Sequence, residues 1–188
     1  MQSTTKAMTG KTTTSKAASH SPAAKSGTAA KSPDEIALLK ADHAEVKKCF
    51  QAYEKLATAE ADGDERQAMA EKICSLLTVH ATIEEEIFYP AAREALGEDA
   101  NLVDEADVEH AGAKDLIAQI EAMSPDDDHY DAKLKVLSEY IEHHVKEEQD
   151  EMFPKCREAD MDLKGLGAEL AARKEELVSD MAGSLQAR

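Results

Sequence analysis

Apolar residues recur every three or four positions along most of the chain, a spacing that predicts amphipathic α-helices. The first helix is expected to begin at Ser-Pro-Asp-Glu, residues 32–35, with Ser32 as its N-cap. Asp-Gly-Asp at 62–64 should end it and cap a second helix, which runs from about residue 65 to at least 89. Pro90 is expected to kink or end that helix, because proline lacks a backbone N–H.

Three further apolar stripes complete the pattern. Those over 103–120 and 134–152 predict a third and a fourth helix, the fourth ending near Pro154. A fifth, shorter helix is expected over 162–183. Four long amphipathic helices with short turns predict an all-α, up-down-up-down four-helix bundle, in which the first and third helices run parallel.

The pattern divides the chain into three parts. Residues 1–32 are mostly Ser, Thr, Ala, Lys and Gly and cannot bury enough apolar surface to fold, so they are expected to form a disordered tail. Residues 33–160 should form the bundle. Residues 161–188 should form a C-terminal helical extension, which either packs on the bundle or serves a dimer contact.

Composition agrees with a helical protein. Aromatic residues make up only 4%, and Gly and Pro number 8 and 5, which argues against a turn-rich β fold. Three Cys without close pairing give no disulfide framework and favour a reducing, cytoplasmic compartment. The sequence has no apolar run of about 18 residues and no apolar leader, so neither a membrane span nor a secretory signal is expected.

Charge is unevenly distributed along the chain. The net charge is −17, but residues 1–32 contain five Lys and no acid, which leaves a net charge of −22 on the remainder. Such an acidic body repels phosphate backbones and anionic lipid, and it concentrates cations near its surface. The basic tail is expected to be solvated beside this body. Nucleic-acid binding by the tail is the alternative.

One motif occurs twice in the chain. His80 and His144 are each followed four residues later by a glutamate, Glu84 and Glu148. An aromatic residue and then Pro follow at the ninth and tenth positions after each histidine, and Arg-Glu-Ala comes soon afterwards. Positions i and i+4 lie on one face of a helix about 6 Å apart, so the imidazole and the carboxylate can share a metal ion. The repeat predicts a metal site built across two similar helices.

The other two long helices each place one histidine in the middle of an apolar stripe. Four imidazoles and two carboxylates should therefore meet in one interior, where burying uncompensated charge is costly. A bound cation removes that cost, so the sequence predicts a metal centre. The six predicted ligands are His43, His80, Glu84, His110, His144 and Glu148.

The ligand set restricts the metal. Imidazole with carboxylate suits Fe, Mn or Zn, and six side chains exceed the roughly four ligands that one Zn takes. They fit two ions of about six-coordinate geometry that share bridging carboxylates and an oxo or hydroxo group. About two coordination positions then stay open for O2, NO, peroxide or water. Ferritin-like bundles carry ExxH motifs with more carboxylates than histidines, so the reversed order here favours reversible dioxygen-type binding.

With these residues, the chain resembles the hemerythrin, or HHE cation-binding, domain over roughly 33–160. The runs Asp42-His43, 84–90 and 148–155 are typical of bacterial members. The resemblance implies a non-haem di-iron centre in which His43 and His80 hold one iron, His110 and His144 hold the other, and Glu84 and Glu148 bridge them.

The chain departs from this resemblance at one position. Oxygen-carrying hemerythrins have a fifth histidine one turn after the third, where this chain has Lys114. The departure does not favour simple oxygen transport. It resembles the bacterial HHE branch, which is associated with oxygen, nitric oxide or redox sensing, peroxide handling and iron homeostasis.

Neighbouring residues offer alternatives to two ligands. His143 could replace His144, although it precedes the apolar stripe and is expected to be exposed. Glu147 could replace Glu148, although the match to Glu84 favours Glu148. The side chains expected to be solvated, packed or inert are Glu85, Glu86, Tyr53, Tyr140, Cys49, His20 and His129.

Three functions are consistent with such a centre. The first is a di-iron protein that binds or senses O2 or a related small molecule, such as NO or peroxide, in oxidative stress or iron homeostasis. The second is a di-iron redox enzyme, either peroxide-consuming or oxidase-like. The third is a regulatory bundle in which the metal only holds the helices together, and the tail and fifth helix do the work.

Overall fold

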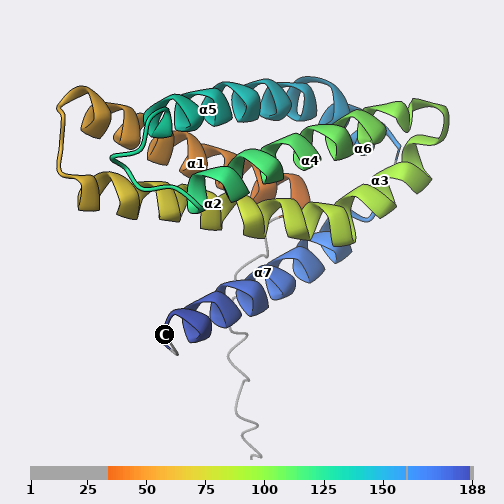
Figure 1. Ribbon diagram of the computed structural model, residues 1–188. Helices are drawn as coiled ribbons and strands as arrows, with labels where there is room; N and C mark the ends of the chain where they lie inside the picture. Colours follow the sequence, from red (N-terminus) through yellow and green to blue (C-terminus); the bar gives the residue numbers. More distant parts are fainter. Residues whose placement is uncertain (1–33, 160, 187–188) are drawn as a thin grey trace, which may run out of the picture. The chain divides into compact units, whose positions relative to one another are not determined.

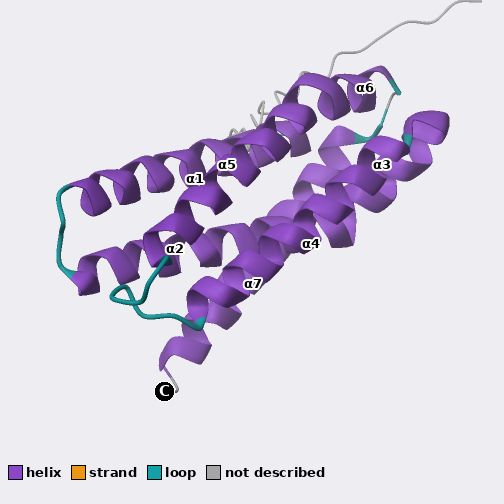
Figure 2. Cartoon of the chain, turned by 45° about the horizontal axis from the view of Figure 1, so that its top comes forward, coloured by secondary structure: helices purple, strands orange, loops and turns teal. Residues whose placement is uncertain are grey.

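The structure is a computed structural model that describes residues 34–159 and 161–186, so the tail predicted over 1–32 lies outside the described residues. Within these ranges the chain forms helices joined by short loops and contains no strand (Figure 2). The elements are α1 (Glu35–Thr58), α2 (Gly63–Ile83), η1 (Glu84–Phe88), α3 (Tyr89–Leu96), η2 (Gly97–Asp99), α4 (Asn101–Glu121), α5 (Tyr130–Glu147), η3 (Glu148–Met152), α6 (Phe153–Glu158) and α7 (Leu163–Gln186).

Four of these helices form the predicted bundle (Figure 1). α1 packs against α2 and α5, and α4 packs against the same two helices from the other side. Each helix therefore turns its apolar stripe toward a shared interior. The prediction of an all-α four-helix bundle is confirmed.

The first two helices are capped by aspartates. Asp34 is the N-cap of α1, since its side chain accepts a hydrogen bond from the Ala37 N–H at 2.8 Å. The prediction that Ser32 would be the cap is therefore wrong by two residues. Asp62 caps α2 as expected, accepting from the Asp64 N–H at 2.9 Å. Each cap satisfies a backbone donor that has no partner within its helix.

The second and fourth bundle helices do not end at their prolines. η1 is a π-helical turn, closed by a hydrogen bond from the Tyr89 N–H to the Glu84 carbonyl five residues back. Pro90 then lies in the first turn of α3, a position where proline is tolerated, and the helix continues to Leu96. Pro90 therefore does not end the helix, and that part of the expectation is wrong.

The same arrangement occurs in the second copy of the motif. The Phe153 N–H donates to the Glu148 carbonyl across η3, Pro154 begins the next turn, and α6 runs to Glu158. The prediction of an end near Pro154 is thus also wrong, for the same reason. The repeated aromatic-Pro sequence marks a repeated π-turn, and in each copy the turn begins at the glutamate of the motif.

The core consists of two apolar clusters with polar side chains between them. One cluster contains Val46, Phe50 and Leu137, and the other contains Leu39, Phe88 and Phe153. The buried polar side chains are few, and all six predicted ligands are among them. They are Glu35, Asp42, His43, His80, Glu84, His110, His144 and Glu148.

α7 lies along the outside of the bundle against α1, α2 and η1 (blue in Figure 1). It has 24 residues, as many as α1, so the expectation of a shorter helix is wrong. Leu170 is fully buried in the second apolar cluster. Two neighbouring cations, Arg173 and Lys174, bond to Glu86 on η1 and Asp42 on α1. α7 therefore packs on the bundle. Across the described ranges, none of the helices is long and apolar enough to cross a bilayer.

Candidate metal centre

Each of the four bundle helices contributes one buried histidine to the layer between the apolar clusters. Each π-turn contributes the glutamate at its first position, one turn after a histidine. The sources are His43 on α1, His80 on α2, His110 on α4, His144 on α5, Glu84 on η1 and Glu148 on η3. The structure thus brings together all six residues that the sequence singles out.

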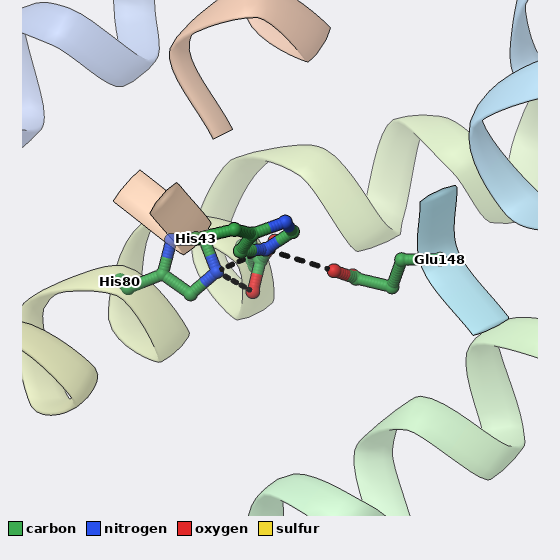
Figure 3. Close-up of side chains that lie close together, drawn as sticks. His43, His80 and Glu148 are labelled. Atoms are coloured by element: carbon green, nitrogen blue, oxygen red, sulfur yellow. Dashed lines mark hydrogen bonds and ion pairs between the residues drawn. The ribbon is translucent and has the colours of Figure 1, made fainter. Parts of the chain in front are cut away.

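The first half of the layer joins α1, α2 and the two glutamates. His43 Nε2 and His80 Nε2 face each other 2.9 Å apart. His43 Nε2 lies 3.2 Å from Glu148 Oε2, and His80 Nε2 lies 3.2 Å from Glu84 Oε2. Figure 3 shows Glu148 pointing toward the paired imidazoles. Four donor atoms from these side chains lie within 4.8 Å of one another.

The second half repeats this arrangement with α4 and α5. His110 Nε2 and His144 Nε2 are 3.1 Å apart. His110 Nε2 lies 3.4 Å from the Oε2 atom of Glu84, the same atom that faces His80. His144 Nε2 lies 3.6 Å from Glu148 Oε2, which also faces His43. Both carboxylates therefore stand between the two histidine pairs.

The polar atoms of this layer are incompletely satisfied by the protein. Neither carboxylate oxygen of Glu84 nor Oε2 of Glu148 has a hydrogen-bond partner, although both side chains are buried. Burial and the adjacent Glu148 raise the pKa of Glu84 well above its ordinary value. Burial also acts to raise the pKa of Glu148, but the nearby imidazoles of His144 and His43 outweigh it, so that pKa is lowered. Buried, unpartnered oxygens converging with four imidazole nitrogens fit a cation.

The far sides of the imidazoles are held by polar neighbours. An outer carboxylate on Nδ1 fixes the orientation and tautomer of a metal-binding histidine. The side-chain amide nitrogen of Gln149 lies 3.1 Å from His43 Nδ1. The three carboxylate contacts are His110 Nδ1 to Glu85 Oε1 at 3.0 Å, His144 Nδ1 to Glu109 Oε2 at 2.7 Å, and His80 Nδ1 to Asp42 Oδ2 at 3.6 Å.

The two histidines of the second half have different electrostatic surroundings. Burial, followed by the adjacent His144, lowers the pKa of His110 to about 4. Burial acts in the same direction on His144, but Glu148 and Glu109 outweigh it and raise the pKa of His144.

Tyr89 makes a polar contact with the layer that the sequence did not predict. In the sequence it is only the aromatic residue nine positions after His80. Its hydroxyl donates to Glu148 Oε1 at 3.1 Å and lies 3.1 Å from His110 Nε2. Burial raises its pKa well above the ordinary value, so the phenol keeps its proton. The second copy of the motif has Phe153 at this position, stacked on His43. The two copies of the motif differ here, with Tyr in one and Phe in the other, and this difference could have indicated a polar role for Tyr89.

Lys114, which stands where a fifth histidine is expected in oxygen carriers, does not join the donor groups. Its amine lies 2.5 Å from Glu85 Oε2, while the other oxygen of Glu85 faces His110. Glu85 is thus an outer partner of a predicted ligand. Its side chain is 30% exposed, and it belongs to neither donor group. Glu86 pairs with Arg173 on α7.

The remaining candidates lie away from the inner layer. The side chain of His143 is 60% exposed, and its contacts are Glu109 and Glu147. Neither His143 nor Glu147 takes the place of a predicted ligand. Tyr53 packs in the first apolar cluster, which agrees with a core role, and its hydroxyl donates to Asp131. The described residues that remain are Tyr140, packed beside Gly112, buried Cys49, and His129 at the start of α5; His20 lies outside the described ranges.

A small cavity adjoins the four histidines. Its volume is about 20 Å³, and its other walls include Leu77, Ile117 and Ile141. By the same measure, about 10–15 Å³ holds one water molecule, so the cavity has room for a molecule of two or three atoms. Lys114 also lines it.

The family comparison agrees with this geometry. The model of the hemerythrin HHE cation-binding domain matches residues 34–156, more than half of the chain. The chain therefore belongs to the hemerythrin HHE cation-binding domain family. Among the described residues, the buried His and Glu groups of the inner layer could hold such a cation.

Two known proteins are similar to the chain. A crystal structure of a hemerythrin HHE cation-binding domain-containing protein from Mycobacterium kansasii matches with a TM-score of 0.68 and 24% identity, over 82% of this chain and 93% of that one. This likeness shows a shared fold. A DNA nickase from Nostoc sp. is 33% identical over 81 residues, which are 43% of this chain and 22% of the nickase. The chain thus matches less than a quarter of that relative's length.

Proposed function

We propose that this chain holds two non-haem iron ions in the histidine–glutamate layer and uses them to bind or sense a small molecule. His43 and His80 would hold one ion and His110 and His144 the other, with Glu84 and Glu148 shared between them. Imidazole with carboxylate is a donor set that suits iron. The free, buried cysteines support a reducing, cytoplasmic setting.

One observation carries the proposal of two ions rather than one. Glu84 belongs to both donor groups, and each group has its own pair of histidines. The same Oε2 atom of Glu84 lies 3.2 Å from His80 Nε2 and 3.4 Å from His110 Nε2. A carboxylate placed between two histidine pairs is suited to neutralise and bridge two cations.

The size of the adjoining cavity supports O2, NO or peroxide as the ligand. A space of about 20 Å³ beside the four histidines excludes larger molecules. The iron pair, when bound, supplies redox-active coordination positions for such a ligand. The protein's own residues orient the imidazoles through Glu85 and Glu109, exclude bulk water, and keep a proton on the Tyr89 hydroxyl beside Glu148.

A di-iron redox enzyme is the alternative, and two observations favour it. The Tyr89 hydroxyl is held between Glu148 and His110, where it can donate a hydrogen bond to a reacting ligand. A groove of about 1020 Å³ runs along α1 and α5 with His43 in its wall, which is enough room for a larger substrate. DNA is not proposed as a substrate of this chain, because the net charge of −22 on residues 33–188 repels DNA.

The test is an anaerobic spectroscopic titration. Protein loaded with Fe²⁺ and kept reduced should change its near-ultraviolet and visible absorption on addition of O2 or NO. His110→Asn should lose most of that change, whereas His129→Asn, at the start of α5 and outside the layer, should keep it. An iron-loaded protein that responds to neither gas would refute small-molecule binding. Turnover of peroxide well above that of free iron would favour the enzyme.

A further inference from the structure

A second cluster of metal-ligating side chains lies on the surface, directly outside the inner layer. It consists of Glu109 on α4 and His143 and Glu147 on α5, with one donor atom from each residue within 4.8 Å of the others. His143 Nε2 lies 3.2 Å from Glu147 Oε1 and 3.6 Å from Glu109 Oε1. His143 and Glu147 are separated by four residues, so this pair repeats the spacing of the inner pairs one residue earlier in the sequence.

The charges of this cluster are not balanced by protein cations. Within 4.0 Å, no lysine or arginine of the described ranges reaches Glu109 or Glu147, although most other paired acids of the chain have such a partner. The Glu109 side chain is only 12% exposed, and that of Glu147 is 30% exposed. Two partly buried carboxylates facing one imidazole therefore attract a cation, and the acidic body raises the cation concentration around them.

Glu109 joins this cluster to the inner layer. Its Oε1 atom faces His143, whereas its Oε2 atom accepts a 2.7 Å hydrogen bond from the Nδ1–H of His144. His144 Nε2 in turn points to His110 and Glu148. One carboxylate and one imidazole thus separate the surface cluster from the second inner donor group.

We propose that Glu109, His143 and Glu147 form an outer divalent-cation site, which captures a first-row metal ion such as Fe²⁺ or Mn²⁺ on its way to the inner layer. One imidazole with two carboxylates is a donor set that these ions accept, and the remaining positions stay with water. With only three side-chain ligands and an exposed histidine, the site binds weakly and releases its ion. Delivery rests on the proposed inner metal centre, whereas capture does not.

Capture is tested by titrating the iron-loaded protein with Mn²⁺ and measuring free Mn²⁺ by electron paramagnetic resonance. The wild-type chain should bind one additional Mn²⁺, and His143→Asn and Glu147→Gln should each weaken that binding at least about tenfold. The matched control is Glu142→Gln, which removes a 73% exposed carboxylate on the same helix that pairs with Lys47, and its affinity should not change. A wild-type chain that binds no additional Mn²⁺, or variants that bind it equally well, would overturn the site.

Delivery is tested by the rate at which the metal-free protein takes up Fe²⁺ without oxygen. His143→Asn and Glu147→Gln should fill the inner layer about tenfold more slowly than wild type but reach the same final iron content, because neither residue touches an inner ligand pair. Equal rates would overturn delivery. If no variant and no wild-type sample takes up inner iron, delivery and the proposed function fail together. Capture is then decided by the same Mn²⁺ titration on the metal-free protein, in which His143→Asn and Glu147→Gln should still bind one Mn²⁺ fewer than wild type and Glu142→Gln.

Discussion

Replacing Glu35 by Gln should change how the stability of this bundle depends on pH. Glu35 lies in the first turn of α1, is fully buried, and has no hydrogen-bond partner for either carboxylate oxygen. Burial, followed by the nearby charges of Asp34 and Asp162, raises its pKa from 4.5 to about 7. The folded state therefore holds the proton more tightly than the unfolded chain does.

The direction and size of the pH effect on the free energy of unfolding follow from this difference in pKa. The group imposes no penalty below pH 4.5, where both states are protonated, and the free energy of unfolding falls as the pH rises from 4.5 to about 7. A difference between pKa values of about 7 and 4.5, at about 1.36 kcal/mol per pKa unit, gives a loss of up to about 3 kcal/mol. Gln has nearly the same shape and does not titrate, so Glu35→Gln removes the pH-dependent part and leaves the packing.

The assay is urea unfolding of the metal-free protein, followed by far-ultraviolet circular dichroism, at about pH 5 and about pH 8. The stability of the variant relative to wild type should increase by about 2–3 kcal/mol between these pH values. Titrating groups that do not interact with Glu35 are common to both chains and cancel. Glu45→Gln, an exposed carboxyl on the same helix, should differ from wild type by no more than about 0.5 kcal/mol. A difference between Glu35→Gln and wild type that stays constant with pH would show that folding does not raise the pKa of Glu35.

Three further predictions concern packing and the metal. Leu170→Ala on α7 should lower the free energy of unfolding, measured in urea, by about 2–5 kcal/mol, because Leu170 is fully buried. Val178 is half exposed on the same helix, so Val178→Ala should cost no more than about 0.5 kcal/mol. Equal effects would show that α7 is not part of the folded core. Tyr89→Phe should cost about 1–3 kcal/mol in the metal-free protein, since Glu148 loses a buried donor, and an unchanged urea midpoint would contradict that contact. Removing the metal with a chelator should lower Tm, because an ion present at about 1,000 times its Kd stabilises the folded state by about 4 kcal/mol; a Tm independent of chelator would contradict metal binding to the folded state.

The sequence was sufficient for the bundle and for the meeting of six side chains, and the reason is periodicity. Each candidate histidine sits on an apolar stripe, so helices that bury their stripes must bring the histidines together. Pairing His80 with Glu84 and His144 with Glu148 required only the spacing of one helical turn. Their role as metal ligands stays a prediction, because it depends on an ion rather than on the fold.

Other features could not be predicted from the spacing of residues along one helix. The π-turns at Glu84 and Glu148 were missed because a proline reads locally as a helix end, whereas a wider turn before it lets the helix continue. The contact of Glu109 with His144 depends on the register between α4 and α5, which the sequence of neither helix specifies. The packing of α7 was left open for the same reason, since an amphipathic helix can bury its face against its own bundle or against a second copy.

The metal content of protein purified from iron-supplied cells would show whether the layer holds two iron ions. We expect about two irons per chain, with near-ultraviolet charge-transfer bands that change on reduction and return in air. Glu84→Ala should lose most of the iron, because Glu84 belongs to both donor groups. One zinc per chain, or no bound metal, would show that the layer is not a di-iron centre.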